Sequence, residues 1–107
     1  MPVQLTAQGK TLFALLSGDI DHHTAPALRE QIDNAVTEYR PRMLCLDFSA
    51  VSFMDSSGVG LVMGRYRHNA AFGGDTQVCG LSPSAERIMK MSGLGKIVSF
   101  KKNAEGG

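Results

Sequence analysis

The sequence predicts an α/β domain with a small, mixed and mostly parallel β-sheet and helices packed on it. The 107 residues suit a single domain, residues 1–107, and 43% of them are apolar, which is enough for one hydrophobic core. Apolar residues alternate with polar ones near the N-terminus and recur at steps of three and four in later segments. In chain order these patterns give β-β-α-β-α-β-α-β, and each strand-helix-strand unit predicts a right-handed parallel crossover.

The first two strands are expected to form a β-hairpin. Apolar and polar residues alternate over residues 3–7, a glycine-containing turn occupies residues 8–10, and an apolar run follows over residues 11–16. Residues 17–23 are mostly polar and are expected to form the loop that leads into the first helix.

The first helix is predicted from Ala25 to Tyr39, because apolar residues recur there at steps of three and four. Thr24 is the expected N-cap, and Pro26 is acceptable in the first turn of a helix. Pro41 is expected to stop the helix on the far side.

A central strand and a second helix are predicted next. Residues 43–48 are almost wholly apolar, as expected of a parallel strand that is covered on both faces. A helix is predicted over residues 57–72, and Gly73 and Gly74 close it. The residues expected to face inward on this helix are Val59, Val62, Met63, Tyr66 and Ala70.

Three glycines distinguish the second helix. Gly58, Gly60 and Gly64 each weaken a helix by about 1 kcal/mol relative to alanine. Close approach to a neighbouring backbone or to a partner is the simplest way to offset that cost.

A strand, a helix and a strand are expected to complete the chain. The strand is predicted over residues 76–80, and Pro83 marks the start of a third helix that ends near Gly93. The last strand is expected over residues 96–100, and the polar, glycine-ended segment 101–107 is expected to be frayed.

Composition argues against several classes of function. The formal net charge is +1, so no cationic face is expected to bind nucleic acid. No apolar run approaches the roughly 20 residues that span a bilayer, and the N-terminus lacks a signal peptide, so a cytoplasmic protein is expected. Cys45 and Cys79 lie in apolar runs and are expected to be core thiols, and neither a metal nor a cofactor is predicted.

The candidate functional segment is residues 53–60, which joins a buried strand to the first turn of a helix. It places Ser56 and Ser57 at a helix N-terminus, where unpaired backbone N–H groups favour an anion, so a phosphate added to Ser57 would be accommodated. A simpler interpretation is that Asp55 or Ser56 only caps the helix. Capping does not explain the glycines that follow.

Two other chemistries are disfavoured at this segment. A phosphate-binding loop needs a glycine-rich run that ends in Gly-Lys-Ser or Gly-Lys-Thr, and Asp55 would repel a nucleotide. A serine hydrolase needs a Gly-x-Ser-x-Gly elbow, but Asp55 stands at the position of its first glycine relative to Ser57.

Histidines and arginines outside this segment are expected at the surface. His22 and His23 follow Asp21 in a loop, where adjacent side chains usually point apart, so a proton-transfer pair or half a metal site is a weaker interpretation. Arg65 and Arg67 on the second helix are expected to be solvated.

Several stretches of the chain together resemble the STAS domains of anti-sigma factor antagonists, most closely the sporulation branch of that family. Asp-Ser-Ser-Gly at residues 55–58 is suggestive alone, and Asp-His-His-Thr at residues 21–24 makes the resemblance specific. The matching stretches, which extend over nearly the whole chain, are residues 18–25, 52–60, 64–66, 82–83 and 91–94.

This resemblance implies a STAS fold and a partner switch without enzyme activity. The unphosphorylated antagonist would bind an anti-sigma factor that is also a serine kinase, and so release the sporulation sigma F factor. Phosphorylation of the second serine of the motif, which maps onto Ser57, would inactivate it, and a PP2C-type phosphatase would restore it. The free protein would be a monomer. The residues that map onto the partner-binding surface are Asp21, His22, His23, Thr24, Asp55, Ser56, Ser57, Gly58 and Gly60.

Two alternatives stay open. A general-stress anti-sigma B antagonist works by the same switch, and a STAS module that senses a ligand, or acts chemically through Ser57 near a histidine, would have no sigma-factor partner. Asp19 and Ile20 stand where the family often has Glu and Leu, which leaves partner specificity open. Family members commonly continue into a C-terminal helix, which is expected to be short, absent or outside this chain because only seven residues follow Phe100.

Overall fold

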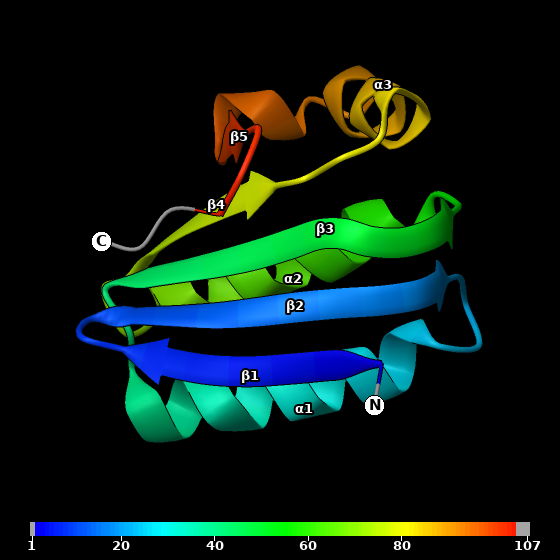
Figure 1. Ribbon diagram of the computed structural model, residues 1–107. Coiled ribbons are helices and arrows are strands. Elements are labelled where there is room, and N and C mark those ends of the chain that lie inside the picture. The colour runs from blue at the N-terminus through cyan, green and yellow to red at the C-terminus, as the bar shows by residue number, and fades with distance from the viewer. Residues whose placement is uncertain (1, 105–107) are drawn as a thin grey trace.

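The computed structural model describes residues 2–104 and arranges five strands in one sheet (Figure 1). The first strand pairs antiparallel with the second, and the other neighbours pair in parallel. The predicted sheet type and the predicted order of strands and helices are therefore confirmed. The elements are β1 (Val3–Gln8), β2 (Thr11–Ile20), α1 (Ala25–Tyr39), β3 (Met43–Met54), α2 (Ser57–Ala70), β4 (Asp75–Cys79), α3 (Pro83–Met91), a short 3-10 helix η1 (Leu94–Lys96) and β5 (Ser99–Lys101).

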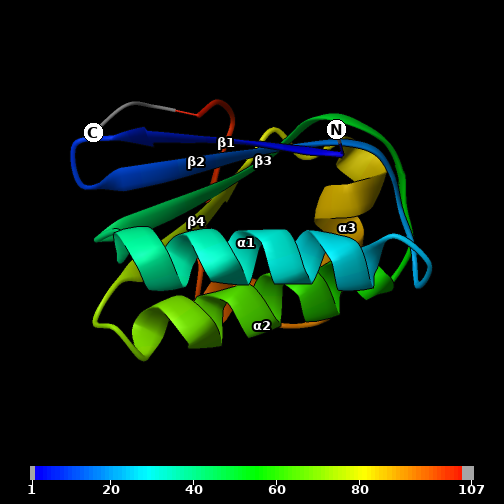
Figure 2. The ribbon, with the colours of Figure 1, turned by 90° about the horizontal axis from the view of Figure 1, so that it is seen from below.

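The helices cover one face of the sheet, but they are not spread evenly over it. α1 and α2 lie side by side across that face (Figure 2), and α3 lies beyond β4 (Figure 1). No helix of the described residues covers the opposite face of β1, β2 and β3. The core lies between the sheet and the helices, and its large fully buried side chains include Leu16, Leu44 and Leu46 from strands and Leu28, Ile32 and Met89 from helices.

β2 and β3 both continue past their predicted ends. Residues 17–20, expected to be a loop, pair in parallel with the second half of β3, from Ser17 opposite Ala50 to Ile20 opposite Met54. The register shifts once before this stretch, between Leu15 and Ser17, and once within it, after Gly18, whose φ of 77° is a left-handed conformation that glycine adopts readily. The loop prediction is wrong because these polar residues become a strand only through pairing with a segment that is distant in sequence.

Other boundaries shift by a few residues. The last strand is Ser99–Lys101 rather than residues 96–100, because η1 takes up the preceding residues. Lys101, predicted to begin a frayed tail, is the last residue of β5, and residues 105–107 of that tail lie outside the described residues.

The buried face of α2 differs from the predicted one. Val62 is buried and Val59, Met63 and Tyr66 are partly buried against the core, as predicted, but Ala70 is exposed. Arg65, expected to be solvated, is only 6% exposed, and its Nε lies 2.5 Å from Oδ1 of Asp33 on α1. The charge of Arg65 is tolerated on this face because Asp33 pairs with it. The buried residues of α2 are Gly58, Leu61, Val62, Arg65 and Asn69.

Internal packing explains one of the three helical glycines. A Cβ on Gly58 would lie 2.3 Å from Sδ of Met54, which is buried beneath the start of α2. Nothing lies within 4 Å of a Cβ built on Gly60 or Gly64. Close approach therefore accounts for Gly58, whereas the other two glycines leave open space at the helix surface.

Alanine at these positions should separate the two cases. Gly64→Ala should raise the free energy of unfolding by about 1 kcal/mol, because it removes the flexibility of glycine without a clash. Gly58→Ala should not raise the free energy of unfolding in this way, because Met54 must move to make room for the new methyl group. Urea unfolding of both variants measures the difference, and an equal gain for Gly58→Ala would contradict the packing argument.

Candidate functional site

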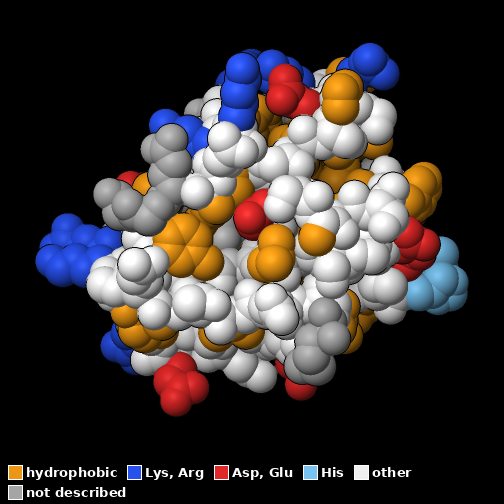
Figure 3. Space-filling view, viewed as in Figure 1, with side chains coloured by type: hydrophobic (Ala, Val, Ile, Leu, Met, Phe, Trp, Pro, Cys, Tyr) orange, Lys and Arg blue, Asp and Glu red, His pale blue; other side chains and the backbone are white. Residues whose placement is uncertain are grey.

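The two segments that sequence analysis singled out lie side by side at one edge of the sheet. β2 and β3 are parallel neighbours, so both end at the same edge, with Ile20 opposite Met54. The N–H of Asp55 donates to the carbonyl oxygen of Ile20 at 3.1 Å, which ties the two chain ends together. Histidine side chains project from this edge, and the Lys and Arg side chains visible in the same view gather along other margins (Figure 3).

Asp21 and Thr24 hold the first segment in shape. Oδ1 of Asp21 accepts hydrogen bonds from the N–H groups of His23 at 2.9 Å and Thr24 at 3.0 Å. Oγ1 of Thr24 accepts from the N–H of Asp21 at 3.0 Å and donates to the carbonyl oxygen of Asp19 at 2.9 Å. Thr24 stands at the N-cap position of α1, as predicted, but its side chain caps no helical N–H. It closes the preceding loop instead.

The two histidines of this loop are exposed, as expected, but they do not point apart. The rings of His22 and His23 lie 4.0 Å apart between centroids, tilted by 38°. Because the loop backbone is held by Asp21 and Thr24, both imidazoles are left at the surface for other contacts.

Asp55 anchors the start of α2. Its Oδ1 accepts a hydrogen bond from the N–H of Ser57 at 2.8 Å. Ser56 occupies the N-cap position, but its side chain accepts no helical hydrogen bond. The capping interpretation therefore holds for Asp55 and not for Ser56, and within residues 2–104 neither serine hydroxyl has a hydrogen-bond partner.

A cavity of about 330 Å³ opens beside Ser57, between the first turns of α1 and α2. Gly60 lies one turn along α2, where the lack of a side chain leaves the space open. The other lining residues are His22, Ala25, Pro26, Arg29, Leu61 and Arg65.

This cavity interrupts a series of polar contacts between α1 and α2. Nε2 of His68 lies 2.8 Å from Oγ1 of Thr37, and the ion pair of Arg65 with Asp33 follows toward the helix N-termini. One turn further on α1, Arg29 lines the cavity. No carboxylate in residues 2–104 lies within ion-pair distance of Arg29.

The predicted partner-binding residues fall into different structural roles. Three of them, His22, Ser57 and Gly60, line the cavity. Asp21, Thr24 and Asp55 fix the backbone of the two segments, His23 and Ser56 are exposed beside them, and Gly58 is buried over Met54.

Sequence analysis missed the two arginines of the cavity. A signal was present in the spacing, because residues four and eight positions apart lie on one face of a helix: Arg29 shares a face with Asp33, and Arg65 shares one with Ser57. That signal has meaning only once α1 and α2 are known to pack with these faces together.

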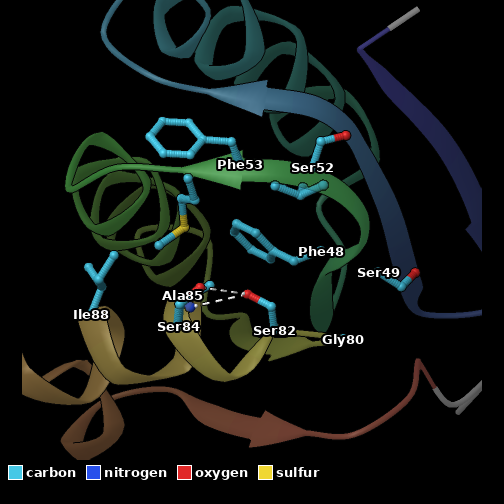
Figure 4. A pocket seen from close by; sticks show the side chains of 11 residues that line it. Phe48, Ser49, Ser52, Phe53, Gly80, Ser82, Ser84, Ala85 and Ile88 are labelled. Carbon is cyan, nitrogen blue, oxygen red and sulfur yellow. Dashed lines mark hydrogen bonds between the residues drawn. The ribbon is translucent and has the colours of Figure 1, made fainter.

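A second, larger cavity of about 450 Å³ lies between the second half of β3 and the start of α3 (Figure 4). No charged residue lines it, and Phe53 at its rim is 56% exposed. Oγ of Ser82 accepts the N–H of Ala85 at 3.2 Å, which caps α3, and lies 3.3 Å from Oγ of Ser84. A charged ligand would find no ionic partner there, in contrast to the cavity beside Ser57.

The cysteines are buried, as predicted. Their Sγ atoms lie 3.4 Å apart on neighbouring strands, and burial, together with the hydrogen bond to Cys45, raises the pKa of the Cys79 thiol. Within residues 2–104 no cluster of His, Cys, Asp or Glu is arranged to hold a metal ion. None of the helices described there is both long and apolar enough to cross a bilayer.

The family model of the STAS domain matches residues 3–106. The matched range spans all five strands, the Asp21 to Thr24 loop and the turn that leads into α2. The chain therefore belongs to the STAS domain family.

Two relatives are similar to this chain over most of its length. The anti-sigma F factor antagonist of Paenibacillus polymyxa is 35% identical over 103 residues, which cover 96% of this chain and 88% of the relative. The anti-sigma-B factor antagonist of Bacillus subtilis is 32% identical over 92 residues, with 86% and 83% covered.

Solved structures of the anti-sigma factor antagonist SpoIIAA are also similar. The unphosphorylated form has a TM-score of 0.80 at 34% identity, with 94% of this chain and 89% of that chain covered. The phosphorylated form has a TM-score of 0.73 at 34% identity, with 94% and 92% covered. Within the STAS family, the chain groups with the anti-sigma factor antagonists.

Asp21 should make stability depend on pH. The N–H of Thr24 lowers the pKa of the Asp21 carboxyl, with a smaller contribution from His23 and opposition from desolvation. A lowered pKa in the folded state stabilises the protein above the ordinary carboxyl pKa, and this stabilisation is lost as the pH falls through the folded-state value. Asp21→Asn should therefore unfold more easily than the unsubstituted protein at neutral pH, and the difference should shrink toward about pH 2.

Asp19→Asn is the matched control, because the Asp19 side chain has no hydrogen bond or ion pair among residues 2–104. Urea unfolding at a series of pH values measures both variants. A difference for Asp21→Asn that stays constant with pH would contradict the role of its charge.

Proposed function

We propose that this protein is the antagonist in a partner switch. Its unphosphorylated form binds an anti-sigma factor that is a serine kinase and so releases the sporulation sigma F factor. Phosphorylation of Ser57 ends this binding, and a PP2C-type serine phosphatase restores it. The protein acts in the cytoplasm, is a monomer when free, and catalyses no reaction itself. The names of its relatives and the two phosphorylation states of SpoIIAA support this proposal.

The observation that carries the proposal is the hydroxyl of Ser57, which has no hydrogen-bond partner within residues 2–104 and stands on a fixed helical turn. Asp55 holds the backbone N–H of Ser57, and the partly exposed side chain lines a cavity beside the loop 21–24. The backbone that carries this hydroxyl would therefore be presented to a kinase in a fixed conformation. The open space at Gly60 allows a partner surface to approach closely.

Phosphorylation would act mainly through local charge and bulk. A phosphoryl group adds about −1.5 to −2 charges next to the carboxylate of Asp55. Two unit charges about 6 Å apart at an effective dielectric near 20 interact by ~3 kcal/mol, and exposure reduces this value. This repulsion within the domain is present whether or not a partner is bound. The loss of binding therefore comes from the bulk and charge that the phosphoryl group places at the interface, where an unfavourable change of ~3 kcal/mol weakens binding by roughly a hundredfold.

The general-stress branch is the second candidate. The anti-sigma-B factor antagonist of Bacillus subtilis covers most of this chain at 32% identity, close to the value for the anti-sigma F relatives. The two candidates share the same switch and differ in the kinase. Parallel binding measurements with the anti-sigma F and anti-sigma B kinases distinguish them, because only the cognate kinase should be retained.

Ser57→Ala should abolish phosphate incorporation when the protein is incubated with ATP and the cognate kinase. Ser56→Ala is the matched control, because its hydroxyl lies one residue away and has the same freedom. Mass spectrometry of the unsubstituted protein should place the phosphate on Ser57. Phosphate on Ser56 alone, or on neither serine, would refute this site.

Ser57→Asp should weaken kinase binding by about 10- to 100-fold while the melting temperature stays nearly unchanged, because the added charge lies at a helix N-terminus that tolerates it. Ser56→Asp adds the same charge at the neighbouring position and should weaken binding less. Calorimetric titration and thermal unfolding measure the two effects. A large fall in melting temperature for Ser57→Asp would show that the switch acts through the fold.

A further inference from the structure

The cavity beside Ser57 has an unpaired cation in its wall. Arg29 lines the cavity from α1, and within residues 2–104 it has neither a carboxylate in ion-pair distance nor a hydrogen-bond partner. One turn further along the same helix, Asp33 holds Arg65 in an ion pair at 2.5 Å. The packing of α1 against α2 thus pairs the guanidinium of Arg65 with Asp33 and leaves that of Arg29 at the open cavity.

Gly60 is the reason that this space exists. A Cβ at Gly60 would meet nothing within 4 Å, and Gly60 lines the same cavity as Arg29 and Ser57. Any larger residue would project toward the cavity. Its place in a helix costs about 1 kcal/mol relative to alanine, and no contact inside the domain offsets that cost.

We propose that this cavity is the receptor for the phosphoryl group on Ser57, with the guanidinium of Arg29 as its principal ligand. Arginine binds phosphate oxygens through two parallel N–H donors, which makes it well suited to such a group. Asp55, whose carboxylate accepts the N–H of Ser57 and does not line the cavity, repels the phosphate and so favours its placement in the cavity. The imidazole of His22 at the rim is a second donor. This inference rests on the proposed modification of Ser57.

The receptor gives the modification a second consequence beyond repulsion. A phosphate held by Arg29 fills the cavity between α1 and α2 and neutralises part of its own charge within the domain. The phosphorylated surface then differs from the free one both in shape and in the availability of Arg29. Removal of the phosphate requires that it leave the guanidinium, so the receptor also slows the phosphatase step.

The test uses protein with phosphoserine installed at position 57 during translation, so that no kinase is needed. Phosphorus NMR follows the second ionisation of the phosphate, which is ordinarily near pH 6. In the phosphoserine protein without other substitutions, this second ionisation should occur about one pH unit lower, because Arg29 favours the dianion. Arg29→Gln should return it to the ordinary value, and Arg29→Lys should preserve part of the effect.

Two further variants test whether the shift comes from the cavity or from the overall electrostatic field of the protein. Arg67→Gln removes the same charge from the exposed surface of α2 and should leave the ionisation unchanged. Gly60→Leu fills the cavity and should return the ionisation to the ordinary value. Because the imidazole of His22 is the second donor at the rim, the series is repeated with His22→Gln. The charged groups around the phosphate are Arg29, Arg65 with Asp33, His22 and Asp55.

Two results would contradict the proposed receptor. One is a second phosphate ionisation at the same pH in the Arg29→Gln and Arg67→Gln proteins, and the other is an ionisation near pH 6 in the phosphoserine protein without other substitutions. Failure of every kinase to modify Ser57 would instead refute the proposed function and leave this measurement intact. A lowered value that survives Gly60→Leu would place the phosphate outside the cavity and would also overturn the inference.

Discussion

The parallel pairing between the second halves of β2 and β3 is the constraint on which the site depends. The ladder runs on to Ile20 opposite Met54, and the N–H of Asp55 adds one more bond to it. If each strand stopped where its apolar run stops, the loop 21–24 and the turn at Ser57 would leave the sheet at different levels. The extended pairing brings both to one edge, so that residues distant in sequence form one surface.

Polar groups, rather than apolar burial, then set the geometry at this edge. The carboxylates of Asp21 and Asp55 each accept hydrogen bonds from backbone N–H groups, and such bonds to a charged acceptor are stronger than those between neutral groups. Such bonds fix the backbone without covering it. His22, Ser56 and Ser57 therefore stay accessible on a segment whose main chain is held in place.

The sequence predicts the fold well because apolar periodicity reports burial directly, and α1 begins and ends at the predicted residues. The second half of β3 and the strand character of residues 17–20 escaped prediction because each is stabilised by the other across the sheet. The two segments of the site follow from their motifs. Arg29 and Arg65 do not, since their roles depend on which faces of α1 and α2 meet, and polar side chains in an interface look like solvated ones in the sequence.

Gly60 shows how stability and function are balanced in α2. A domain of this size is stable by roughly 5 to 15 kcal/mol, so a helical glycine that costs about 1 kcal/mol lowers the folding stability by a substantial fraction. The ion pair of Arg65 with Asp33, and the hydrogen bond from Asn69 to the carbonyl oxygen of Asp75 at 2.8 Å, hold the rest of the helix against its neighbours. Because those contacts lie away from the first turn, a charge added at Ser57 alters the surface without loosening the helix. The switch proposed for Ser57 would gain from this separation, since the group that would change is not one of the groups that keep the domain folded.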